Sequence, residues 1–221
     1  MKKLYFISKS KTKAKEVAAI LADTVEVEFR KEELPKIQST KIKKLVKKKA
    51  KEAYKIVRRP VLVEHTSLCI EAFHDLKGLD TNYFSFVVGY ENIVAYCEYK
   101  NDFRAYVESV FCLCDGKEYF IARAKDRGEI IRSSKSVEDI NGGFGWDTIF
   151  VPNEDNQDRK TYEELKRMDP ERQTMRRKAL KKLKDGYAFQ EKGTEWDTVY
   201  EEQEAHLDEL AQQICEGKVM L

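Results

Sequence analysis

The most informative stretch of the sequence is Gly142-Gly143-Phe144-Gly145-Trp146-Asp147. Its three glycines allow a backbone to approach a ligand closely, and its two aromatic side chains offer stacking faces. The Asp147 carboxylate can accept hydrogen bonds from the edge of a base. A tight turn with aromatic side chains in the core fits the same residues. The stretch therefore indicates either a binding loop or a structural turn.

A second polar segment follows an apolar strand upstream. Val61-Leu62-Val63 runs directly into Glu64-His65-Thr66-Ser67. Acidic and imidazole groups at the end of a buried strand are costly unless they have a partner or a function. The segment is either a functional strand end or a capped strand end at the surface.

Basic residues occur in two further segments. Ser8-Lys9-Ser10-Lys11-Thr12-Lys13 lies between an expected strand and an expected helix, whose first amides and positive dipole end suit phosphate. A lysine-rich surface turn is the other interpretation. The run Arg172–Lys178 begins an expected helix, and such runs are usually solvated faces.

The periodicity of the chain predicts an α/β fold with a mixed sheet. Apolar residues at helical spacing (Ala14, Val17, Ala18 and Leu21) follow the first short strand, and alternation over 24–30 predicts the next strand. The dipeptide Asp115-Gly116 between alternating runs predicts a hairpin. Helices are expected over 41–57, 161–167, 173–184 and 198–216. Hairpins mixed with helical crossovers are typical of this fold class.

Composition excludes several classes of function. The 221 residues carry a formal net charge of +2, which argues against a protein that coats nucleic acid. Seven lysines lie between Lys41 and Lys51, but aromatic residues are scarce there, so phosphate contacts by one or two lysines are favoured over nucleic acid. No run approaches the roughly 18 apolar residues of a membrane span, and no secretory signal is evident. A cytosolic protein is expected.

The five cysteines suit that compartment. Cys69, Cys97, Cys112, Cys114 and Cys215 form no pair of metal-binding motifs. Cys112 and Cys114 would point to the same face of a strand. Buried reduced thiols are predicted.

In their order, these segments resemble the inosine triphosphate pyrophosphatases. The family's motifs are T-x-N-x-x-K, V-E-D-T-G-L, G-F-G-[WY]-D-P-x-F and S-H-R. Their counterparts here are 8–13, 63–68, 143–150 and 174–176, and the resemblance covers about residues 1 to 185. It implies a two-lobed fold with a nucleotide cleft between the lobes. The expected organisation is a domain over 1–185 and an acidic helical extension over 186–221.

The resemblance also implies a set of substrate-binding residues. Phe144 and Trp146 would lie against the purine, Asp147 at its edge, and Arg176 at its 6-oxo group. Lys13 and Lys49 would contact the phosphates, with Ser8 and Ser10 in the same turn. Met175 stands where the family has histidine.

The catalytic residues of the family are incomplete here. Family enzymes hold Mg²⁺ with acidic residues and position water with an aspartate, whose place is taken by His65. Glu64 alone remains as a catalytic or metal-binding carboxylate. The segment near Thr40 and Lys41, where another acid is expected, has no carboxylate. Mg²⁺ wants several oxygen ligands, so either Mg²⁺ or no cofactor is expected. His65 could act as a base, but would still lack those ligands.

Two main functions follow from this pattern. The first is a sensor or regulatory subunit, for example in a defence or stress complex, that binds deaminated purine nucleoside triphosphates of the dITP, ITP and XTP type with weak or absent hydrolysis. The second is an active Mg²⁺-dependent pyrophosphatase with a rearranged site, and a purely structural paralogue is a third reading. The expected partners are a purine nucleoside triphosphate and either a second copy or another protein docked on the extension, but neither nucleic acid nor membrane.

Overall fold

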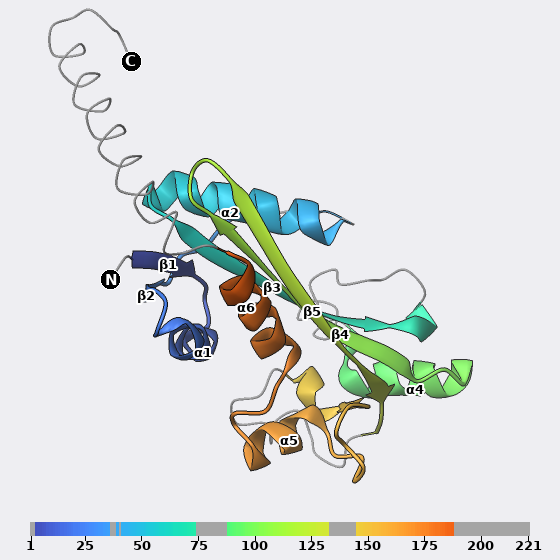
Figure 1. Cartoon of the computed structure of the whole chain (residues 1–221). Coiled ribbons are helices and arrows are strands. Elements are labelled where there is room, and N and C mark those ends of the chain that lie inside the picture. Colours follow the sequence, from blue (N-terminus) through green and yellow to red (C-terminus); the bar gives the residue numbers. More distant parts are fainter. Residues whose placement is uncertain (1–2, 36–38, 40, 74–87, 133–144, 188–221) are drawn as a thin grey trace, which may run out of the picture.

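The chain begins with a β-α-β unit (Figure 1). The computed structural model describes residues 3–35, 39, 41–73, 88–132 and 145–187. Strand β1 (Lys3–Ile7) leads into helix α1 (Lys11–Leu21) and then strand β2 (Glu26–Arg30). Ala14, Val17 and Leu21 are the buried residues of α1. These three belong to the apolar stripe predicted from sequence, so this helix is confirmed.

The described strands form one mixed sheet in the order β2-β1-β3-β4-β5-β6. The other strands are β3 (Val61–Ile70), β4 (Arg104–Cys114), β5 (Tyr119–Ile130) and β6 (Phe150–Pro152). β1 pairs parallel with β2 and β3, whereas the β3–β4, β4–β5 and β5–β6 pairs are antiparallel. The predicted α/β class with a mixed sheet is confirmed.

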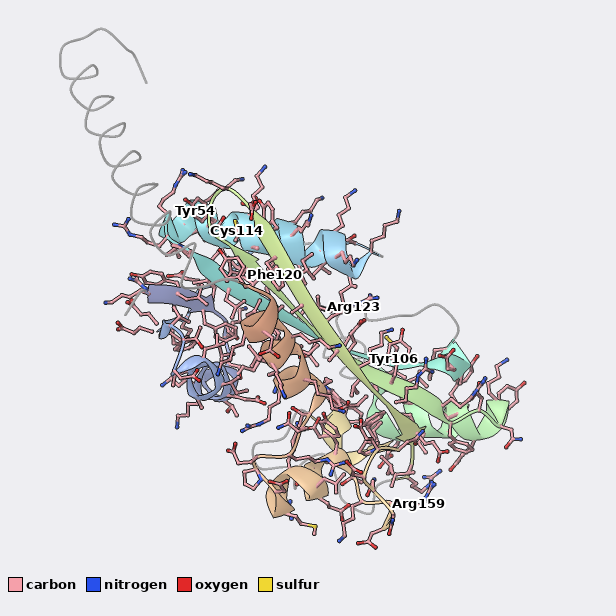
Figure 2. The ribbon with its side chains drawn as sticks, in the orientation of Figure 1. Tyr54, Tyr106, Cys114, Phe120, Arg123 and Arg159 are labelled. Carbon is pink, nitrogen blue, oxygen red and sulfur yellow. The ribbon has the colours of Figure 1, made fainter. Side chains whose placement is uncertain are left out.

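The turn between β4 and β5 is the hairpin predicted at Asp115-Gly116. The Asp115 carboxylate accepts hydrogen bonds from the backbone N–H of Lys117 at 3.0 Å and Glu118 at 2.7 Å. Gly116 has φ +98°, and a Cβ there would meet the ring of Tyr54 on helix α2 (Ile42–Val57). Figure 2 shows Tyr54, Cys114 and Phe120 at this end of the long hairpin and Arg159 at the opposite end of the molecule.

Helices cover both faces of the sheet (Figure 1). Helix α2 (Ile42–Val57) packs Val46, Ala50 and Ala53 on one face. α1 and α6 (Met175–Gly186) pack on the other face, with Leu180 and Leu183 of α6 in the same cluster as Leu4 and Phe6 of β1. Opposite placement of α1 and α2 around parallel strands is the arrangement of a doubly wound sheet. α6 ends one residue beyond the expected domain boundary at 185.

A separate apolar cluster lies at the far end of the long strands. It joins Leu68 of β3 and Val107 of β4 to helix α4 (Tyr90–Lys100), helix α5 (Tyr162–Met168) and the 3₁₀ turns Glu71–Phe73 and Trp146–Thr148. Between it and the cluster under α6, the same sheet face carries polar Glu64, Thr66 and Ser109, since side chains alternate along a strand. A polar band therefore separates two apolar halves.

The start of α5 is fixed by a capping box. Thr161 accepts a hydrogen bond from the N–H of Glu164, and the Glu164 carboxylate accepts from the N–H of Thr161 at 2.7 Å. The helix begins one residue after the predicted start at 161 because Thr161 serves as its cap. Likewise Thr174 caps α6, whose start was predicted at 173.

Removing this cap should destabilise the protein measurably. Thr161→Ala is expected to lower the free energy of unfolding by about 1 kcal/mol, because an N–H of α5 loses its partner. Urea denaturation followed by circular dichroism measures the change. Thr12→Ala, at an exposed position inside α1, is the matched control, and an equal loss in both variants would contradict the assignment.

Four of the cysteines lie in described residues, and all four are buried free thiols, as predicted. Cys112 and Cys114 share the cluster under α2. Cys215 lies outside the described residues. No helix in the described part of the chain has the length and apolar character needed to cross a membrane.

Candidate functional site

The site lies where β1 ends and α1 begins. β1 is flanked by β2 on one side and β3 on the other, so successive connections leave it in opposite directions. In open α/β sheets, ligands bind in the crevice at the carboxyl ends of strands at such a switch point. Ser8 and Ser10 form this turn: Ser8 Oγ accepts from the N–H of Ser10 at 3.1 Å, and Ser10 Oγ caps α1 by accepting from the N–H of Lys13 at 3.3 Å.

Glu64 is the centre of a buried ionic network at this turn. Its Oε2 accepts from Lys13 Nζ at 2.6 Å, and its Oε1 faces Arg176 Nε at 3.4 Å. Ser109 Oγ donates to Oε1 at 2.9 Å, and the Thr66 hydroxyl donates to the same oxygen. Glu64 is 5% exposed and Arg176 is 4% exposed. Charged groups buried to this degree require partners of this kind.

Lys49 reaches the same residue from the helix on the other side of the sheet. Its Nζ donates to the backbone carbonyl of Glu64 at 2.8 Å. The β1–β3 pairing ends at Ile7 and Val63, so that carbonyl lies just beyond the last paired residue of β3. Lys13, Lys49, Glu64 and Arg176, four residues assigned from the resemblance, are therefore brought together by the fold.

The network sets the ionisation of its members. Burial alone would raise the pKa of Glu64, but the charges of Lys13 and Arg176 and the hydrogen bonds from Lys13 and Thr66 hold that pKa well below its ordinary value. Burial would lower the pKa of Arg176, but Glu64 and Glu16 outweigh this and raise it. Glu64 is thus a firmly ionised carboxylate and Arg176 a permanent cation.

The side chain of His65 lies on the other face of the sheet from Lys13 and Arg176. It follows Glu64 on β3, and adjacent side chains on a strand point to opposite faces. Its partner in the sheet register is Val110, which packs under α2 with Val63. A residue on that face is separated by the sheet from Lys13 and Arg176. The catalytic role assigned to Glu64 and His65 stays a prediction.

The glycine-rich stretch contributes both a turn and core aromatics. Gly145 has φ +64°, and a Cβ there would meet the Tyr90 hydroxyl, which explains the glycine. Trp146 is 2% exposed and packs tilted on Tyr162 and edge-on to Phe150. In the described structure Trp146 is a core residue, so its contact with a purine remains a prediction. Phe144 lies outside the described residues.

Asp147 is buried, and one of its two carboxylate oxygens is hydrogen-bonded to a lysine. Its Oδ2 accepts from Lys166 Nζ at 2.8 Å, whereas its Oδ1 is buried without a hydrogen-bond partner among the described residues. Its charge also contributes to the raised pKa of Arg176. Asp147 is therefore electrostatically coupled to the network around Glu64.

Sequence reasoning did not identify Thr66, Ser109, Glu16 or Lys166 as parts of the site. Thr66 follows Glu64 by two residues on a strand, and Glu16 follows Lys13 by three residues on a helix. Each spacing places the two side chains on the same face, so the sequence could have indicated both residues. Glu16 Oε2 accepts from Arg176 at 2.8 Å. Ser109 lies in the site because β4 pairs with β3 in a register that places it beside Thr66. No local sequence pattern predicts this register. The run Arg172–Lys178, interpreted as a solvated face, instead buries Arg176.

The described residues do not fit a Mg²⁺ ion. Both oxygens of Glu64 are engaged by cations and hydroxyl groups. In the described ranges no group of three or more His, Cys, Asp and Glu side chains is placed to hold a metal. Mg²⁺ is bound through oxygen ligands in octahedral geometry, and a carboxylate facing Lys13 and Arg176 is poorly suited to it.

Comparison with known proteins gives the family. The model described as the Ham1 family matches residues 4–186. Inosine triphosphate pyrophosphatase 2 of Trypanosoma cruzi is 33% identical over 183 residues, covering 82% of this chain and 90% of the relative. The inosine triphosphate pyrophosphatase of Aspergillus fumigatus is 33% identical over 184 residues, covering 82% and 92%. The Ham1 protein of Staphylococcus aureus superposes with a TM-score of 0.66 at 19% identity, covering 82% of this chain and 96% of that one. This chain therefore belongs to the Ham1 family.

Proposed function

We propose that this protein binds deaminated purine nucleoside triphosphates, of the dITP, ITP and XTP type, and hydrolyses them weakly or not at all. The observation that carries the proposal is the network of Lys13, Arg176 and Glu64 at the end of β1. Cations suited to a nucleotide are assembled there, while the Glu64 carboxylate between them is engaged. Relatives named inosine triphosphate pyrophosphatases supply the nucleotide class.

The base would be recognised at the other end of the polar band. Asp147, one of whose buried oxygens has no hydrogen-bond partner in the described ranges, would accept a hydrogen bond from the base edge. Trp146 and Phe144 would contact the ring, and Arg176 the 6-oxo group. Tight binding of the substrate alone does not accelerate hydrolysis, because only interactions stronger in the transition state do so. A site rich in cations but poor in free carboxylates suits binding better than turnover.

Binding and turnover should be measured on the same preparation. Isothermal titration calorimetry with dITP, ITP, XTP and dATP is expected to give binding of the first three and weak or no binding of dATP. Pyrophosphate release in Mg²⁺ or Mn²⁺ is expected to be absent or slow. Release at ordinary enzyme rates, about 1–1000 per second, would overturn the non-hydrolytic part of the proposal.

A matched pair of lysine variants tests the phosphate contacts. Lys13→Met should weaken dITP binding by about tenfold or more, since a hydrogen bond to a charged group contributes about 1.5–3 kcal/mol. Lys9→Met changes a lysine of the same turn whose side chain is 64% exposed, and should leave affinity unchanged. Equal effects in both variants would indicate a diffuse charge effect and contradict a built site.

An active pyrophosphatase is the second candidate, and the names of the relatives favour it. It would need a metal-binding arrangement, which the described residues do not form. The pyrophosphate assay separates the two candidates directly.

A sensing or regulatory role requires a partner for the nucleotide-bound state. We infer that residues 186–221, an acidic extension, dock on a second copy or on another protein in the cytosol. Size-exclusion chromatography of full-length protein and of a 1–187 variant, which keeps the buried Tyr187, with and without dITP, tests this. If the full-length and the truncated protein elute at the same apparent oligomeric state with and without dITP, the docking role of the extension is contradicted.

A further inference from the structure

The environment of Glu64 is built for an anion. Lys13 is the third residue of α1 and Arg176 the second residue of α6, so both lie in the first turn of a helix, where the helix dipole favours negative charge. Lys49 approaches from α2 and donates to the backbone of Glu64. Two cationic side chains, each from the first turn of a helix, thus face one carboxylate, and a third cation holds its backbone carbonyl.

Lys13 and Arg176 both contact this one carboxylate. Arg176 also pairs with Glu16 at 2.8 Å, whereas Arg177 is matched by Glu16 at 3.8 Å and Glu171 at 2.7 Å. A buried cation is unfavourable without an anion beside it, so Lys13 and Arg176 need Glu64 or another anion in its place. A triphosphate carries several negative charges, whereas Glu64 carries one.

We propose that Glu64 is an internal counter-ion, and that a bound nucleoside triphosphate takes over its two cations, with a phosphate group on Lys13 and the 6-oxo group on Arg176, without requiring a divalent cation. This inference rests on the proposed function and adds how the positive charge of the site is neutralised. The lysine and arginine side chains supply the positive charge that Mg²⁺ supplies in a metal-dependent site. Chelation of the triphosphate by Mg²⁺ lowers its negative charge, and so weakens its competition with Glu64.

The first test compares affinities with and without metal. Calorimetric titration of dITP into the full-length protein in EDTA is expected to give affinity equal to or higher than that in excess Mg²⁺. Inorganic tripolyphosphate, which carries the charges but no base, is titrated under both conditions and should show the same order. A requirement for Mg²⁺ by both ligands would overturn the inference.

The second test removes the counter-ion. Glu64→Gln is expected to tighten dITP and tripolyphosphate binding in EDTA by about tenfold, equivalent to ~1.4 kcal/mol. Glu108→Gln is the matched control, because Glu108 is equally buried on the neighbouring strand but lies on the opposite sheet face from Ser109. The Glu108→Gln variant should bind dITP and tripolyphosphate as tightly as the unmodified protein does. If Glu64→Gln does not fold, the metal comparison on the unmodified protein decides the matter alone.

The outcomes separate this inference from the proposed function. Tripolyphosphate binding in EDTA without any preference for dITP over dATP would support the counter-ion role and contradict recognition of a deaminated purine. Binding of dITP only with Mg²⁺, or weaker binding by Glu64→Gln, would overturn the counter-ion role and leave the proposed function standing. Failure of both ligands to bind under every condition would overturn both.

Discussion

Arg176→Ala should lower the free energy of unfolding by about 3–5 kcal/mol, because removing one partner of a buried ion pair leaves an uncompensated charge. The arginine is 4% exposed and its guanidinium contacts Glu64, Glu16 and Thr66. Urea denaturation at pH 7 measures the loss. At that pH Glu64 is ionised in both folded and unfolded protein, since its pKa lies below 4.5 in the former.

An exposed arginine provides the control. Arg159 pairs with Glu129 at 2.8 Å but is 64% exposed, and it lies at the opposite end of the hairpin from Tyr54 (Figure 2). Arg159→Ala should change stability by about 0–1 kcal/mol, as surface ion pairs generally do. A loss of less than about 1 kcal/mol in Arg176→Ala would contradict the buried network.

A double-mutant cycle assigns the loss to the pair. Glu64→Gln and Arg176→Met, alone and together, should show a coupling energy of about 0.5–3 kcal/mol, because the second change removes the charge that the first leaves unpaired. Additive effects would mean that the two residues stabilise the fold independently.

The sequence predicted those elements whose periodicity is strong. Alternation over 24–30 and the helical spacing of Ala14, Val17 and Leu21 gave the opening β-α-β unit, and Asp115-Gly116 gave the hairpin. Helix α4 was not predicted, because its buried residues Ile93, Val94 and Cys97 make only a narrow stripe. The short strand β6 was not predicted either, since three residues are too few to show a period.

The resemblance named three charged residues of the network, but neither their polar neighbours nor the geometry that joins them. Lys13, Glu64 and Arg176 lie far apart in sequence, and only the resemblance indicated that they belong together. That Glu64 and His65 point to opposite faces follows from strand alternation, once β3 is known to continue through the polar segment to Ile70. The continuation depends on pairing with β4, from Val61↔Cys114 to Ile70↔Ala105, which no local pattern of β3 reveals.

Trp146→Ala should destabilise the protein by about 3–5 kcal/mol, the usual cost of truncating a buried large aromatic residue. Trp146 is among the largest fully buried side chains, and its neighbours Phe150 and Tyr162 would be left facing a cavity. Urea denaturation measures the loss. Tyr99→Ala, which truncates an aromatic residue 80% exposed on α4, should change stability by about 0.5 kcal/mol or less.

The same position distinguishes a core role from a stacking role, if two apolar replacements are compared. Trp146→Phe and Trp146→Leu both keep apolar volume in the cluster, so their stabilities should lie close together and above that of Trp146→Ala. Only the phenylalanine retains a ring, and a base stacked on an aromatic side chain gains about 1–3 kcal/mol. If Trp146 contacts the purine, Trp146→Leu should bind dITP at least about fivefold more weakly than Trp146→Phe. Equal affinities in the two variants would make Trp146 solely a core residue, and recognition of the base would then rest on Asp147 and Arg176.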